Sequence, residues 1–207
     1  MGGEPGLAED RQAATGRAAD GGQVPQSIDD LSREELLALM ADMAKRWLAH
    51  DGLWFQAVER AHGLDEAMRL DAEAWRDLTV NEAQRIMRFL HMEPGGGLSA
   101  LERALRFRLY ALVNEQRSER PDENTLVFRM TTCRVQEARR RKGLPDFPCK
   151  AVGIVEYSGF ASTIDPRIKT EVIACPPDDT PRDYYCAWRF TVGGEAGQNP
   201  TAGEGHS

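Results

Sequence analysis

Cysteine is absent from the first 132 residues of this chain, and all four cysteines lie in the last 75. The opening segment, MGGEPGLAED, also lacks the cationic start and apolar core of an export signal, so we expect a cytoplasmic protein. Structural disulfides are rare in that reducing compartment. The clustered thiols therefore need another explanation, and a metal site formed by Cys133, Cys149, Cys175 and Cys186 is the sharpest one.

Long apolar runs and a surplus of positive charge are missing too. The longest apolar segments, such as 151–155, are far shorter than the roughly 20 residues that cross a bilayer. The formal net charge is -7, which repels a nucleic-acid backbone. We therefore expect no membrane and no nucleic acid as a partner, but a small-molecule ligand, with a homodimer left open.

Large apolar side chains are scarce at both ends of the chain. Residues 1–27 are rich in glycine, alanine and charge, and residues 193–207 consist mainly of small and polar residues. Such segments bury too little surface to offset the entropy lost on ordering. We expect a disordered arm over 1–27, a disordered tail over 193–207 and a single folded domain over 28–192.

Apolar residues spaced three to four apart predict helices in the first half of the chain. A capping box at 32–35 marks the start of the first helix, which we expect to run to His62 with a bend or break at 50–52. A proline–glycine segment at 94–97 interrupts the pattern. Further helices are expected over 64–91 and 99–107.

After residue 109 the pattern changes to runs rich in β-branched and aromatic residues. Two strands are expected to form a hairpin through a turn at 121–124, and two more follow later. This order predicts an α+β fold, with an N-terminal helical layer packed on a four-stranded antiparallel sheet. The expected strands cover 110–116, 125–131, 168–174 and 184–192, with helices at 134–142 and 149–160 between them.

A structural zinc site needs four thiolate, imidazole or carboxylate ligands in a tetrahedron. Close pairs such as CxxC are absent, so the fold itself must bring the ligands together. Each cysteine nevertheless lies near the end of a predicted element: Cys133 and Cys175 after strands, Cys149 at a helix start and Cys186 early in a strand. The alternative is that these cysteines are buried free thiols that act as small apolar side chains.

Three segments around the cysteines carry a resemblance: FPCKAVG at 147–153, KTEVIAC at 169–175 and YCAWRF at 185–190. They resemble the C-terminal half of the 4-vinyl reductase domain family. That resemblance implies a compact α+β ligand-binding domain, in which three cysteines and a carboxylate hold zinc beside an apolar pocket for a small, often aromatic, molecule.

The same resemblance implies a ligand set for this chain. Cys149, Cys175 and Cys186 would be the thiolate ligands. The carboxylate is expected three residues before the second cysteine, where this chain has Val172. The fourth ligand is therefore either Cys133 or the neighbouring Glu171.

A second resemblance extends over nearly all of 30–192. On WLAHDGLWF at 47–55, GLPDFPC at 143–149 and DPRIK at 165–169, the chain resembles L-2-amino-thiazoline-4-carboxylic acid hydrolase-like proteins of bacteria and a related bacterial family of unknown function. This resemblance implies the fold, and it implies a hydrolytic reaction only by analogy.

Several other residues are candidates for ligand binding. His50, Asp51 and Trp54 lie within about one helical turn and would bind a small polar aromatic molecule together. In the alternative reading, Trp54 belongs to the core and the histidine and aspartate mark a helix bend. Glu156 and Tyr157 lie close to the cysteine region.

Arg134, beside Cys133, is a candidate for bidentate binding of a ligand carboxylate. The alternatives are structural: Glu156 as a satisfied polar residue at the edge of a packed helix, and the basic run 134–142 as a solvated helix face.

These features favour a zinc-binding domain for a small molecule such as an aromatic or heterocyclic carboxylate. The alternative is a metal-assisted hydrolase that acts on a cyclic amidine such as an aminothiazoline carboxylate. Four protein ligands would close the metal site, whereas three would leave a position for water. A purely structural interaction protein would have no pocket and would pack Trp54 and Tyr157 on all sides.

Overall fold

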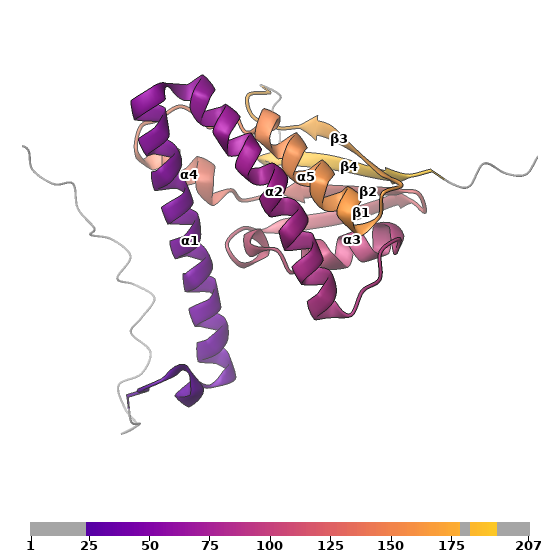
Figure 1. Cartoon of the computed structure of the whole chain (residues 1–207), viewed down its shortest axis with the longest axis horizontal. Helices are drawn as coiled ribbons and strands as arrows, with labels where there is room; N and C mark the ends of the chain where they lie inside the picture. The colour runs from indigo at the N-terminus through magenta and orange to yellow at the C-terminus, as the bar shows by residue number, and fades with distance from the viewer. Residues whose placement is uncertain (1–23, 179–182, 194–207) are drawn as a thin grey trace, which may run out of the picture. The chain divides into compact units, whose positions relative to one another are not determined.

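The computed structural model describes residues 24–178 and 183–193 (Figure 1). The chain divides into two compact units, 1–39 and 40–207, and the sheet lies in the second. Most of the predicted arm and tail, at 1–23 and 194–207, falls outside the described residues. Within the described part, no helix combines the length and the apolar character that a bilayer span requires.

Five helices and four strands make up the regular structure of the described residues. The strands form one antiparallel sheet in the order β1-β2-β4-β3, so the predicted α+β class is confirmed. The elements are α1 (Arg33–His62), α2 (Leu64–Leu90), α3 (Gly97–Leu105), β1 (Gln116–Asp122), β2 (Thr125–Met130), α4 (Arg134–Arg141), α5 (Lys150–Ile164), β3 (Ile168–Ala174) and β4 (Cys186–Val192), with short 3-10 helices at Ile28–Asp30 and Leu109–Leu112.

Helix α5 lies at the centre of the core, because it packs on both α2 and the sheet (Figure 1). Its apolar residues surround the whole helix, as expected for a helix that is buried on several sides. A Cβ atom on Gly153 would lie 2.8 Å from the Trp188 ring, and one on Gly159 would lie 2.6 Å from Thr79. These two glycines therefore allow the close approach of α5 to β4 and to α2.

The core on one face of the sheet follows the alternation of the strands. Inward-facing residues of β2 and β4 meet apolar side chains of α2, α3 and α5. The largest fully buried apolar side chains on this face are Phe128, Trp188, Phe190 and Phe160.

The structure corrects three local predictions. Helix α1 runs without a break through 50–52. The predicted strand over 110–116 begins only at Gln116, because Leu109–Leu112 is a 3-10 helix. Strand β1 itself is polar and almost wholly exposed, so its pairing with β2, and not an apolar face, makes it a strand.

The third correction concerns α3, which starts at Gly97 and not at the predicted residue 99. The Gly97 N–H donates to Oδ2 of the buried Asp165, at 2.9 Å. Arg167 donates to the same carboxylate at 2.7 Å, and also to the Gly95 carbonyl. The protein's own carboxylate therefore caps this glycine-rich helix start.

Candidate functional site

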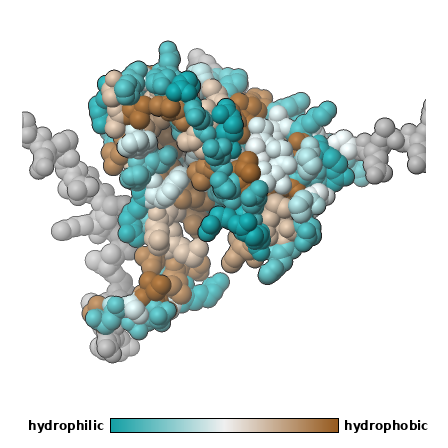
Figure 2. Space-filling model, viewed as in Figure 1, coloured by the Kyte–Doolittle hydropathy of each residue, from teal (hydrophilic) through white to brown (hydrophobic). Residues whose placement is uncertain are grey.

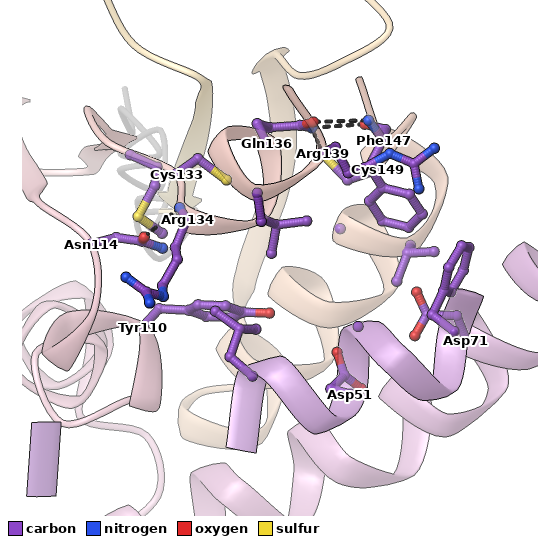
Figure 3. Close-up of a pocket in the computed structure, with 18 of the residues that line it drawn as sticks. Asp51, Asp71, Tyr110, Asn114, Cys133, Arg134, Gln136, Arg139, Phe147 and Cys149 are labelled. Atoms are coloured by element: carbon purple, nitrogen blue, oxygen red, sulfur yellow. Dashed lines mark hydrogen bonds between the residues drawn. The ribbon is translucent and has the colours of Figure 1, made fainter. Parts of the chain in front are cut away.

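A cavity of about 360 Å³ opens between the helices and one end of the sheet. Its lining is predominantly apolar and comes from the second half of α1, from α2, α4 and α5, and from the ends of β2 and β4. Figure 3 shows Asp51 and Asp71 on helices at one side of this pocket, and Cys133 and Cys149 at the other. All four cysteines are among the lining residues.

The strand order explains why the cysteines converge. Strands β2 and β3 both run antiparallel to β4, which lies between them, so the ends of β2 and β3 lie beside the start of β4. Cys133 follows β2, Cys175 follows β3, and Cys186 opens β4. Cys149 joins them because the Lys150 N–H at the start of α5 donates to the carbonyl of Pro176, at 2.9 Å.

All four cysteines are free thiols. The sulfur atoms of Cys149 and Cys175 lie 3.5 Å apart. Hydrogen bonding with Cys149, then with Cys186, and then burial raise the pKa of the Cys175 thiol. For Cys133, burial raises the pKa to about 12, with smaller effects from Cys186 and Cys149.

These thiols have the donor chemistry for zinc, and the spacing of one pair suits it. Two sulfurs bound to zinc at about 2.3 Å in a tetrahedron are roughly 3.8 Å apart, close to the 3.5 Å between Cys149 and Cys175. Across residues 24–178 and 183–193, however, no group of three or more His, Cys, Asp or Glu side chains already has an arrangement that would hold a metal ion. A third ligand would need a side-chain rearrangement.

The two candidates for a fourth ligand lie in different places. Cys133 lines the pocket with the other three cysteines. Glu171 is exposed on β3, contributes nothing to the pocket lining, and forms an ion pair with Arg189 at 3.2 Å. Of the two, only Cys133 shares the cavity.

Side chains of α4 hold the loop that precedes Cys149. The Gln136 side chain accepts a hydrogen bond from the Phe147 N–H and donates one to the Phe147 carbonyl, both at 2.8 Å (Figure 3). Its amide also lies 3.7 Å from the Cys149 sulfur. Arg139 donates to the Pro145 carbonyl at 2.7 Å. The loop before α5 is therefore held by side chains of one short helix.

Two carboxyl groups face the opposite side of the cavity. Burial, followed by the charges of Asp51 and Glu156, raises the pKa of Asp71 to about 7. Burial also raises the pKa of Asp51, which His50 partly opposes. Asp71 is thus poised between its charged and neutral forms near neutral pH, and can either accept or donate a proton.

Behind this side of the pocket lies a buried cation, Arg108. It is 2 % exposed and forms ion pairs with Glu156 at 2.7 Å and with Glu82 at 2.8 Å. Burial alone would lower the pKa of Arg108, but the charges of the two glutamates outweigh it and raise the pKa. The aromatic rings within 6.0 Å of its guanidinium are those of Trp75, Tyr110, Tyr157 and Phe160.

Three of these four rings belong to residues that line the cavity, namely Trp75, Tyr110 and Tyr157. Burial raises the pKa of both Tyr110 and Tyr157 well above the usual tyrosine value. Both phenols therefore remain protonated at neutral pH. Tyr157 stacks on Trp188 at a centroid distance of 4.6 Å, which continues the aromatic wall into the sheet.

The model of a family of unknown function, DUF6125, matches residues 29–192. The chain belongs to this family. No curated protein matches the chain.

The DUF6125 segment includes every candidate residue named above. The two resemblances drawn from the sequence are not tested by this match and stay predictions.

Within the DUF6125 segment, the structure separates the six predicted ligand-binding residues. Asp51, Arg134, Glu156 and Tyr157 line the pocket, whereas His50 and Trp54 do not, and Trp54 is 68 % exposed. The periodicity of the continuous helix α1 explains this separation. His50 and Trp54 are four residues apart on one face of the helix, while Asp51 and Phe55 share another face, which borders the cavity.

Sequence reasoning missed Asp71, Tyr110 and Arg108. A signal for Asp71 was present, because this carboxyl lies four residues from both Ala67 and Trp75 on the buried stripe of a predicted helix. Tyr110 was assigned to a strand. A single arginine in the same ambiguous segment carries no signal that it will be buried.

Proposed function

We propose that this chain is a zinc-binding domain that holds a small molecule in the pocket between its helices and its sheet. The observation that carries this proposal is a cavity of about 360 Å³ beside four converging thiols. Cavities of about 300 to 1,000 Å³ with apolar walls and a few directed polar groups are typical of small-molecule sites. We further propose that the chain works in a reducing, cytoplasmic environment, in which cysteines such as these four stay as thiols.

In this proposal Cys149, Cys175 and Cys186 bind the zinc ion, and Cys133 is the fourth ligand. Zinc held by four protein ligands would act as a structural clamp. The separation of Cys149 and Cys175 supports the first pair. The need for a side-chain rearrangement implies that the site is completed on metal binding.

The charges around the pocket favour a ligand with two different ends. Asp51 and Asp71 lie at one side of the cavity, and Arg134 lies at another side, near Tyr110. A carboxylate would bind the Arg134 guanidinium, while a ring N–H or amino group would donate to the acidic pair. An aromatic or heterocyclic carboxylate with such a donor fits both ends, and the aromatic wall suits its ring.

A second candidate function is a metal-assisted hydrolase that acts on a cyclic amidine such as an aminothiazoline carboxylate. One observation favours it: Asp71, with a pKa near 7, has the protonation behaviour of a general acid or base. This alternative requires three protein ligands on the metal and an open position for water.

A thermal-shift screen tests the proposed ligand class. The zinc-loaded chain is heated with a panel of aromatic and heterocyclic carboxylates, and with the matching amides as controls for the lost charge. A ligand present at about 100 times its Kd adds about 2.7 kcal/mol to the free energy of unfolding, so we expect a rise of several degrees for the acids only.

Arg134→Gln should abolish the preference for acids over amides, while Arg117→Gln, a change on the exposed strand β1, should leave it intact. Absence of any stabilising acid, or equal effects of acids and amides, would contradict the proposal. Turnover of a cyclic amidine, lost in Asp71→Asn while binding persists, would favour the hydrolase instead.

A further inference from the structure

Helix α1 is 30 residues long, yet only Ala44 and Leu48 are buried on it. Beside these two residues runs a row of large apolar side chains that stay in contact with solvent. The exposed fractions are 51 % for Met40, 56 % for Met43 and 40 % for Trp47, and Trp54 continues the row. Figure 2 shows hydrophobic surface along α1 among hydrophilic residues.

The spacing of this row is that of a coiled-coil seam. Met40, Met43, Trp47, His50 and Trp54 are separated by three, four, three and four residues, which is the alternation of a and d positions in a heptad repeat. In the sequence the same alternation extends back to position 36, a leucine. A histidine is the single polar residue in an otherwise apolar seam.

We propose that this row of α1 is the interface through which two copies of the chain form a dimer. With roughly 200 Å² for each fully exposed large side chain, the row and the adjacent Leu53 expose about 1,000 Å² in two copies together. Neighbouring polar side chains add to this area on contact. The apolar area alone is thus close to the lower end of the range of about 1,200 to 2,000 Å² that is common for stable interfaces.

Other occupants fit the row less well. The chain's own terminal segments, 1–23 and 194–207, contain only Met1 and Leu7 as large apolar residues, so they cannot cover it. Surface helices that bind anionic membranes have a polar face rich in basic residues. Helix α1 instead carries both signs, as in the Asp42–Arg46 ion pair at 2.8 Å.

The sizes of the side chains favour an antiparallel arrangement about a two-fold axis. A register centred on position 45 places Met43 against Trp47 of the other copy, and Met40 against His50. Large residues then face smaller ones, which fills the seam evenly. In a parallel register, Trp47 of one copy would instead lie against Trp47 of the other copy. The interface is isologous, so each contact occurs twice and the assembly closes as a dimer.

Sedimentation equilibrium of the full chain tests this proposal without any ligand. We expect twice the chain mass of 23.1 kDa at micromolar concentration. Met43→Lys places a charge in the seam and should weaken association by at least about a hundredfold, while Trp54→Ala should weaken it by at least about tenfold. Far-UV circular dichroism checks that each variant is folded, and the milder Trp54→Ala keeps the test valid if Met43→Lys unfolds.

Phe89→Lys is the matched control, because Phe89 is 73 % exposed on α2 and lies outside the seam. The Phe89→Lys variant should dimerise like the unmodified chain. A monomer at about 100 µM, dimers unaffected by both seam variants, or a monomer that associates through this row only with a different protein would overturn the proposal. Oxidation of mixed Met40→Cys and His50→Cys chains should give a heterodisulfide if the helices are antiparallel.

Discussion

The Arg108 guanidinium lies 2.7 Å from the Glu156 carboxylate, inside the core and directly behind the candidate pocket. This pair joins the segment after α3 to the central helix α5, and Glu82 extends it to α2. Because Glu156 also lines the cavity, a residue that we predicted from the sequence as a ligand contact is held in place by a buried cation.

Arg108→Met removes the cation and leaves two carboxylates close to each other in the core. Breaking a buried ion pair in this way costs about 3 to 5 kcal/mol of unfolding free energy, which urea denaturation at pH 7 measures. Arg106→Met is the control, since Arg106 forms an exposed pair with Glu102 and should cost less than about 1 kcal/mol. Equal losses of unfolding free energy in the two variants would show that the buried ion pair stabilises the fold no more than the exposed one.

Asp71 should make the stability of the fold depend on pH. Its pKa rises from about 3.9 in the unfolded chain to about 7 in the folded one. The folded state therefore binds the extra proton between these values, and the free energy of unfolding falls as pH rises through that window. Asp71→Asn should flatten the dependence between pH 5 and 8 and should exceed the unmodified chain in stability at pH 8.

The control for this test is Asp77→Asn, a change at an exposed position of the same helix. It should reproduce the slope of the unmodified chain. If Asp71→Asn keeps that slope as well, the dependence arises from other groups.

Asp165 should make the free energy of unfolding depend on pH in the opposite direction to Asp71. Hydrogen bonds from the Arg167 side chain, together with backbone N–H groups, lower its pKa to about 2 despite burial. Its stabilising effect is therefore complete above about pH 4 and is lost as pH falls towards 2. Asp165→Asn should lower the free energy of unfolding at pH 7 by about 1.5 to 3 kcal/mol. An acid titration followed by circular dichroism should then show a shallower loss between pH 4 and 2; an unchanged curve would refute this role.

Gly153 should tolerate no side chain. The added methyl group of Gly153→Ala would meet the buried Trp188 ring at 2.8 to 2.9 Å, and we expect a loss of about 1 to 3 kcal/mol from overpacking. Gly52→Ala on α1 is the control, because the nearest atom is 4.0 Å away, and it should be neutral or stabilising by up to about 1 kcal/mol. Thermal unfolding measures both changes, and a neutral Gly153→Ala would show that α5 can shift away from the sheet.

Much of the fold was predictable because its helices and three of its strands carry apolar residues at the proper period. Strand β1 was placed too early, since its exposed segment, QRSERPD, owes its conformation to pairing with β2. Periodicity cannot report such a partner. The break expected at 50–52 does not occur, because one glycine within a long helix costs only about 1 kcal/mol.

The candidate site was predictable where chain topology determines it. Cys133, Cys175 and Cys186 were each assigned to a strand end, and the sheet order then places those ends together. The side of the pocket opposite the cysteines, behind which Arg108 lies, was not predictable. Arg108 comes between short elements, and only three-dimensional packing against four aromatic rings explains why a lone arginine is buried.

Zinc content of the purified full chain tests the central claim most directly, when elemental analysis is combined with titration of reactive thiols. The account predicts one zinc per chain with protected cysteines, and loss of the metal in Cys175→Ser but not in Glu171→Gln. A chain that contains no metal and has four freely reactive thiols would contradict it.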